Sequence, residues 1–186
     1  MSRSNDTARV LAIDPGSRGF GFAVLECPER LIDWGVVEVK DNSHLKQMKR
    51  VANLLERYEP HAIVLEDITS KRSHRCKRIR TLIRSIAKMA GKRKVRIRRF
   101  SPLQLKHAFA PASNKDQIAE AIISQFPELA PRLPQKRKSY TSEHYQMGIF
   151  DAVALGLTFF ALLEKRVKAS TDQTPNGQIH GRFGRQ

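Results

Sequence analysis

Cysteine, acidic residues and long apolar runs are all scarce in this chain of 186 residues. Its two cysteines, Cys27 and Cys76, are too few for a disulfide framework, and neither has cysteine or histidine neighbours at the spacing of zinc ligands. No run of eighteen consecutive apolar residues occurs, and the N-terminal segment lacks the apolar centre of a secretory signal. We therefore expect structural thiols, no membrane partner, and a soluble protein of the cytoplasm or another reducing intracellular compartment.

The shortage of acidic residues leaves a strongly basic chain. It holds 34 Lys and Arg residues against 18 Asp and Glu residues, a formal charge of +16, and Lys71 to Arg99 contains no acid at all. A charged run is often only a solvated face, but so many uncompensated cations favour a polyanionic partner, and nucleic acid is preferred because no aromatic-rich membrane anchor is present. The cations expected to hold a nucleic-acid backbone are Lys71, Arg72, Arg75, Lys77, Arg78, Arg80 and Arg84.

Hydrophobic periodicity predicts alternating strands and helices. Strands are expected at 10–13, 20–24, 31–39, 61–67 and 94–100, and helices at 44–58, 76–92, 103–109, 114–126 and 143–165. Three prolines and a basic cluster indicate a loop over 127–140. The fold class is therefore α/β, with a mixed five-stranded sheet flanked by helices on both faces, in one domain over 1–165 that is followed by a flexible polar tail over 166–186.

Three acids interrupt segments that otherwise look buried. Asp14 follows one apolar strand, Glu66 ends another, and Asp151 lies within the last helix. A lone buried carboxylate is costly, whereas three carboxylates can share a cation, and oxygen ligands select Mg²⁺ or Mn²⁺. The alternatives are ordinary turn chemistry for Asp14, which precedes Pro15, and a lysine partner or backbone cap for Asp151.

Four stretches carry a resemblance to a known family: "AIDPGSRGFGFAV", "IVLED", "SPLQLKHAF" followed by "NKDQIAEAI", and "GIFDAVALGL". In order and interval they resemble the RuvC-type Holliday junction resolvases of the RNase H-like superfamily, over about Val10 to Phe160. The resemblance implies an RNase H-like fold, a homodimer, and paired cuts in branched DNA that leave a 5′-phosphate and a 3′-hydroxyl.

The same resemblance implies roles for particular residues. Asp14, Glu66 and Asp151 match the acids that hold the metals, two Mg²⁺ (or Mn²⁺) ions per active site. Lys106 and Lys115 match lysines that lie near the scissile phosphate, although an exposed helix lysine is the plainer interpretation.

One position departs from the family pattern. Members commonly carry a fourth ligand, Asp or His, three residues before the last Asp, where this chain has Gly148. His144 and Glu143 are the candidates to replace it: His144 lies seven helical residues from Asp151 and so on nearly the same face, whereas Glu143 is turned by about 80°. His144 could equally be an ordinary histidine near the helix cap, and a weakened second metal site is the third alternative.

Three functions remain open at this stage. The first is a metal-dependent endonuclease that resolves Holliday junctions or other branched DNA. The second keeps the fold but acts in RNA processing or on RNA–DNA hybrids. The third is a non-catalytic nucleic-acid-binding module, which Gly148 supports and the three retained acids oppose.

Overall fold

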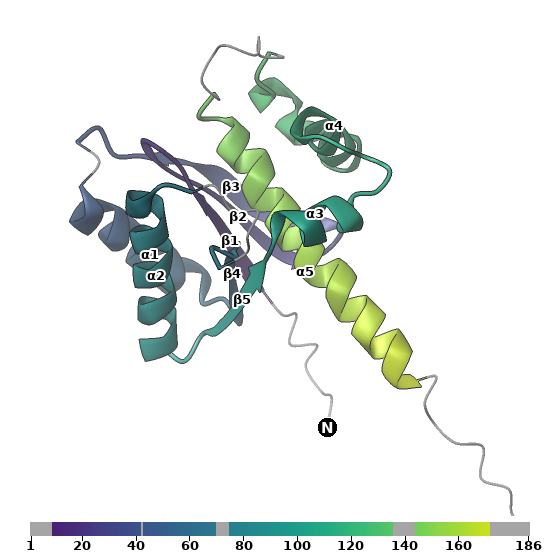
Figure 1. Cartoon of the computed structure of the whole chain (residues 1–186), viewed down its shortest axis with the longest axis horizontal. Helices are drawn as coiled ribbons and strands as arrows, with labels where there is room; N and C mark the ends of the chain where they lie inside the picture. The colour runs from purple at the N-terminus through teal and green to yellow at the C-terminus, as the bar shows by residue number, and fades with distance from the viewer. Residues whose placement is uncertain (1–8, 42, 70–74, 136–143, 172–186) are drawn as a thin grey trace, which may run out of the picture.

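The computed structural model describes residues 9–41, 43–69, 75–135 and 144–171, and it contains one five-stranded sheet (Figure 1). The strand order is β3-β2-β1-β4-β5. Strands β1 and β2, and β2 and β3, pair antiparallel, whereas β1 and β4, and β4 and β5, pair parallel. Strands β1, β3, β4 and β5 therefore all end at one edge of the sheet. The elements are β1 (Val10–Pro15), β2 (Gly19–Cys27), β3 (Arg30–Glu38), α1 (His44–Tyr58), β4 (Ala62–Glu66), α2 (Lys77–Lys92), β5 (Arg96–Phe100), α3 (Pro102–Ala108), α4 (Lys115–Gln125), the 3-10 helix η1 (Pro127–Arg132) and α5 (Met147–Thr171).

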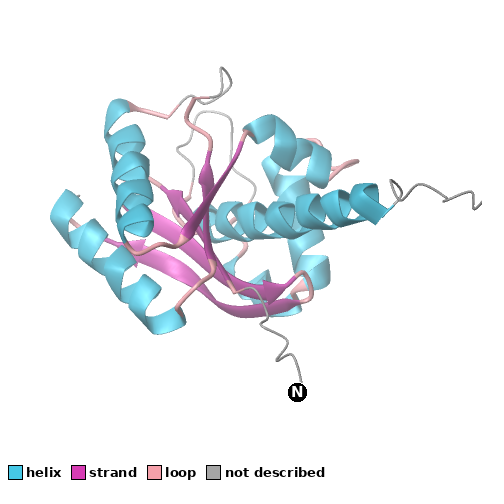
Figure 2. Cartoon of the chain, turned by 90° about the horizontal axis from the view of Figure 1, so that it is seen from below, coloured by secondary structure: helices cyan, strands magenta, loops and turns pink. Residues whose placement is uncertain are grey.

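Helices cover both faces of this sheet, as the sequence predicts (Figure 2). The alternation of β1 divides the core in two: Val10 and Ala12 pack in the cluster that contains α5, and Leu11 and Ile13 pack in the cluster that contains α1 and α2. Because side chains on a strand alternate between faces, Asp14 falls on the α5 face. This parity decides which helix meets the first acid.

Helix α5 lies across β1 and β2. Its segment Met147–Lys165 is long and apolar enough to cross a membrane by length and composition alone. Ala152, Val153 and Leu155, however, are buried against the sheet. We therefore describe α5 as a core helix of this domain.

The α/β prediction, a mixed sheet covered on both faces, is confirmed, although several strand and helix boundaries differ from expectation, most of all near the C-terminus. Helix α5 begins at Met147 instead of 143, and it continues to Thr171, past the domain end expected at 165. The expected loop over 127–140 contains the 3-10 helix η1, and burial of Leu129 in the core stabilises this helical turn. The remainder of the expected tail, 172–186, lies outside the described residues.

Candidate active site at the carboxyl edge of the sheet

Asp14 and Glu66 are neighbours on adjacent parallel strands. Ala12 pairs with Val64 in the β1–β4 register, so two residues further on Asp14 lies level with Glu66. Both residues have the parity of the α5 face, and both strands end at the same edge. Asp14 is 5% exposed, so its carboxylate needs compensation from the protein.

Asp151 joins this edge from α5. It lines one pocket together with Asp14, Arg75 and His144, and we name this cavity of about 260 Å³ the carboxylate pocket. Lys115, the first residue of α4, places its Nζ 2.7 Å from Oδ2 of Asp151. The fold thus brings to one edge of the sheet three acids that are 52 and 85 residues apart along the chain.

Arg75 lies between Asp14 and Glu66. Its Nη2 donates to Asp14 Oδ1, its Nε donates to Glu66 Oε2, and its Nη1 donates to the carbonyl oxygen of Pro15 at 3.1 Å. The sequence predicts Arg75 to be one of the cations that hold a nucleic-acid backbone. In this structure it turns inward instead, because the buried carboxylate of Asp14 and the half-buried carboxylate of Glu66 attract it more strongly than solvent does.

Burial is the main influence on the protonation of Asp14. It raises the pKa of Asp14 from 3.8 to about 7, against the attraction of Arg75, and Asp151 and Glu66 add to the rise while Lys115 opposes it. Burial lowers the pKa of Arg75, but the carboxylates of Asp14 and Glu66 outweigh that effect and raise it above its ordinary value. The carboxyl group of Asp14 is therefore harder to ionise than usual, whereas the guanidinium of Arg75 stays charged.

The donor set suits a hard divalent cation, because all three side chains offer carboxylate oxygens. Their present arrangement differs from the expectation of acids around a common point: among the described residues, no three Asp, Glu, His or Cys side chains are grouped so that they could hold one ion. The reason is local, since Arg75 and Lys115 already neutralise these carboxylates. Asp14, Glu66 and Asp151 therefore have the oxygen donors that such a metal prefers. In this structure one oxygen of each carboxylate is paired with Arg75 or Lys115.

His144 reaches the carboxylate pocket by a route other than the one expected. It precedes α5 in a turn, where Met147 N donates to its carbonyl oxygen at 2.9 Å, so the argument from seven residues of helix is wrong. Its Nδ1 accepts from the backbone N–H of Gln146 at 3.3 Å. Glu143, the other candidate, lies outside the described residues.

Gly148 has a packing role that the sequence does not reveal. A Cβ built on Gly21 of β2 would lie 2.0 Å from the carbonyl oxygen of Gly148, and a Cβ on Gly148 would meet the Gly21 backbone at 3.3 Å. Helix α5 and strand β2 therefore touch backbone to backbone at this point. An acid at position 148 would place its Cβ tightly against the Gly21 backbone, which would have to give by a few tenths of an ångström.

The remaining predicted residues are spread over the surface. Lys106 is exposed on α3 and does not line the carboxylate pocket. On α2, Lys77, Arg78 and Arg84 are exposed and Arg80 is half-buried. Lys71 and Arg72 lie outside the described residues.

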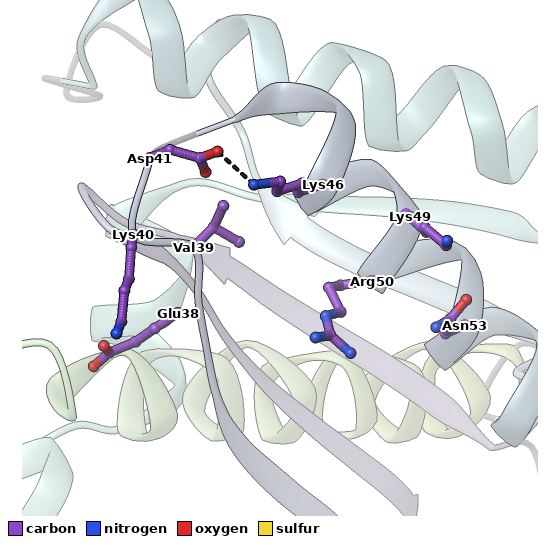
Figure 3. Close-up of a pocket in the computed structure, with 8 residues that line it drawn as sticks. All are labelled: Glu38, Val39, Lys40, Asp41, Lys46, Lys49, Arg50 and Asn53. Carbon is purple, nitrogen blue, oxygen red and sulfur yellow. Dashed lines mark hydrogen bonds and ion pairs between the residues drawn. The ribbon is translucent and has the colours of Figure 1, made fainter.

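A second basic surface was missed in the sequence. A cavity of about 670 Å³ lies between the end of β3 and α1, and four cations line it (Figure 3). The cations of this α1 cavity are Lys40, Lys46, Lys49 and Arg50. Lys46 is paired with Asp41 at 2.6 Å, and Glu38 lines both this cavity and the carboxylate pocket. Helical spacing of Lys46, Lys49 and Arg50 was the available signal.

Comparison with known proteins gives the family. The family model described as "Crossover junction endodeoxyribonuclease RuvC" matches residues 10–134. This chain belongs to the RuvC family. Curated RuvC proteins from two Helicobacter pylori strains, P12 and Shi470, are each 28% identical to it over 162 residues, covering 81% of this chain and 94% of theirs.

Solved RuvC structures share the fold. Thermus thermophilus RuvC in complex with a Holliday junction substrate matches with a TM-score of 0.62 at 21% identity, covering 84% of this chain and 95% of that one. A yeast mitochondrial Holliday junction resolvase matches with a TM-score of 0.57 at 17% identity, covering 90% of this chain and 84% of that one. These matches confirm the RNase H-like sheet of this RuvC family member.

Proposed function

We propose that this RuvC family member resolves Holliday junctions by hydrolysing phosphodiesters at the carboxylate pocket, with divalent cations held by Asp14, Glu66 and Asp151. One observation carries the proposal: three acids from β1, β4 and α5 meet at one sheet edge in a chain of formal charge +16. Clustered carboxylates repel a phosphodiester unless a metal bridges the two. Such a cluster within a basic chain is therefore typical of a metal-dependent nuclease.

Each residue of the pocket has a defined task in this proposal. A bound divalent cation supplies Lewis-acid stabilisation of the phosphodiester oxygens and lowers the pKa of an attacking water. Lys115, already against Asp151, is placed to carry its charge toward a phosphate, and Lys106 on α3 is proposed to contact the same strand. His144 is the described candidate for the ligand that Gly148 does not supply, and it would complete a second Mg²⁺ or Mn²⁺ site.

Two basic surfaces are proposed to hold the duplex arms. The exposed cations of α2 adjoin one side of the carboxylate pocket, since Arg78 donates to the carbonyl oxygen of Ser17 beside it. The α1 cavity adjoins another side through the shared Glu38. Phosphate contacts of this kind fix position and carry little sequence information. Paired cuts require two carboxylate pockets, and for this reason we propose a homodimer.

Cleavage of a labelled four-way junction tests the proposal. The junction is incubated with the full chain in Mg²⁺ or Mn²⁺ beside a linear duplex and an RNA–DNA hybrid, with Asp14→Asn as the inactive control. Paired cuts in the junction alone, leaving 5′-phosphates and lost in the variant, are expected. Cleavage of the hybrid instead would support an RNA-processing nuclease, and tight binding without cleavage in either metal would support a non-catalytic binding module.

A further inference from the structure

The side chain of Arg75 turns toward the carboxylates, unlike that of Arg78 in the same basic stretch. Its side chain is 23% exposed, and all three guanidinium nitrogens donate inward, to Asp14, to Glu66 and to the carbonyl oxygen of Pro15. Arg78, one turn later on α2, is exposed and donates to the backbone carbonyl of Ser17. The same basic segment therefore holds one arginine committed to the acids and others directed outward.

Arg75 engages one oxygen of each of two carboxylates proposed to hold the metal. Asp14 Oδ1 and Glu66 Oε2 each accept one of its N–H groups. A divalent cation between Asp14 and Glu66 would compete for these oxygens, and its charge would repel the guanidinium. Arg75 and a metal shared by Asp14 and Glu66 therefore compete for the same carboxylates.

Removing Arg75 with no replacement would also be unfavourable. Asp14 is buried, and the charges of Glu66 and Asp151 act on its carboxylate. Neighbouring like charges repel when nothing compensates them. The guanidinium therefore holds the carboxylates of Asp14 and Glu66 side by side.

We infer that Arg75 is an internal counter-ion that positions Asp14 and Glu66 and must leave them before metal binds, and that a DNA phosphate is the partner that draws it away. This inference rests on the proposed function. The planar guanidinium fork that grips two carboxylates matches a phosphate equally well. Because binding coupling is reciprocal, junction DNA then raises the affinity for metal, and metal raises the affinity for DNA.

Mn²⁺ binding without DNA tests the competition directly. Free Mn²⁺ is counted by electron paramagnetic resonance in titrations of the full chain, of Arg75→Gln, and of Arg93→Gln. Arg93 is the control because it is also an arginine paired with a carboxylate, that of Glu56, but it does not line the carboxylate pocket. We expect Arg75→Gln to bind Mn²⁺ more tightly, on the order of tenfold, and Arg93→Gln to bind as the parent does. A merely structural arginine would give unchanged or weaker Mn²⁺ binding in Arg75→Gln, and that result would overturn the inference.

A second variant and a second measurement distinguish the inference from simple misfolding of Arg75→Gln. Arg75→Lys keeps the charge but loses the fork, so its Mn²⁺ affinity should fall between those of the parent and Arg75→Gln. Mg²⁺ should also raise the melting temperature of Arg75→Gln by more than it raises that of the parent. An equal or smaller rise in the variant would contradict the competition.

The DNA arm uses a four-way junction with non-hydrolysable linkages. It should tighten Mn²⁺ binding to the parent and leave Arg75→Gln little changed, since the variant has no counter-ion to remove. Equal tightening in both proteins would overturn the role of the DNA phosphate. If neither the parent nor any variant binds Mn²⁺, both the metal site of the proposed function and this inference are wrong. If the parent binds Mn²⁺ and Arg75→Gln binds it no more tightly, only this inference is wrong.

Discussion

The contact between Gly21 and Gly148 gives the sharpest stability prediction. A Cβ on Gly21 would lie 2.0 Å from the carbonyl oxygen and 2.2 Å from the carbonyl carbon of Gly148. Both obstructing atoms are backbone, so no side-chain rotation relieves the overlap. For Gly21→Ala, either α5 or β2 must shift by roughly 1 Å to restore ordinary contact distances.

The magnitudes follow from three glycines in different surroundings. Overpacking costs 1–3 kcal/mol and occasionally more, so Gly21→Ala should lose about 3 kcal/mol of unfolding free energy. At Gly148 the contact of 3.3 Å is only tight, and a helix propensity gain of about 0.5–1 kcal/mol offsets it, leaving a net change within about 1 kcal/mol. Gly91 in α2 has nothing within 4 Å of its Cβ position, so Gly91→Ala should gain about 0.5–1 kcal/mol.

Urea unfolding of the three variants, with a constant slope against denaturant, measures these differences. Gly21→Ala should also reduce junction cleavage, because a shift of α5 moves Asp151 away from Asp14. A Gly21→Ala protein within about 1 kcal/mol of the parent would refute the reasoning, since it would mean that α5 and β2 do not meet backbone to backbone. A Gly148→Ala loss larger than that of Gly21→Ala would refute it equally.

Three further predictions concern charge and capping. Burial raises the pKa of Asp14 from 3.8 to about 7, so the folded protein binds a proton more readily than the unfolded chain, and its unfolding free energy falls as pH rises between these values. Without metal, the unfolding free energy of Asp14→Asn should therefore rise relative to that of the parent by up to about 4 kcal/mol between pH 4 and pH 8. An equal difference between the two proteins at both pH values would contradict the raised pKa. The double substitution of Lys49 and Arg50 by Gln should weaken junction binding, and the slope of log affinity against log salt should fall by the equivalent of about two phosphate contacts. The control Arg30→Gln, at the opposite edge of the sheet, should change neither the affinity nor this slope. Asn114→Ala removes the side-chain acceptor of the α4 N-cap and should cost about 1 kcal/mol in thermal unfolding; no loss would mean that the cap contributes nothing.

Apolar periodicity made most of this fold predictable. Strands whose residues are buried on both faces and helices with one apolar side can be recognised without knowledge of their partners. The resemblance to the RuvC-type resolvases added the RNase H-like fold, whereas the order of the strands in the sheet comes from the structure. The three acids were predictable for the same reason, because Asp14, Glu66 and Asp151 each interrupt an apolar stretch. The start of α5 was not, since residues 144–146 could belong to either a turn or a helix by composition.

Two features of the site depend on tertiary contacts and left no sequence signal. Gly148 is informative only beside Gly21, and these residues are 127 positions apart. Arg75 is one of fourteen cations between Lys71 and Arg99, and nothing local distinguishes it from its neighbours. Its role becomes visible only where β1 and β4 present two carboxylates to the residue that precedes the α2 cap.

Formal charge explains why an exchange of cations suits this site. When all three are ionised, Asp14, Glu66 and Asp151 carry three negative charges, and Arg75 and Lys115 contribute two positive ones, so the group keeps one negative charge. One divalent cation that replaces both side chains leaves the same single negative charge. The two cations are then available for the phosphates of DNA, which would otherwise be repelled by the acids. A chain with many spare cations can therefore keep its acids neutralised before substrate arrives, and in the proposed mechanism the cations released on metal binding would already lie beside the scissile strand.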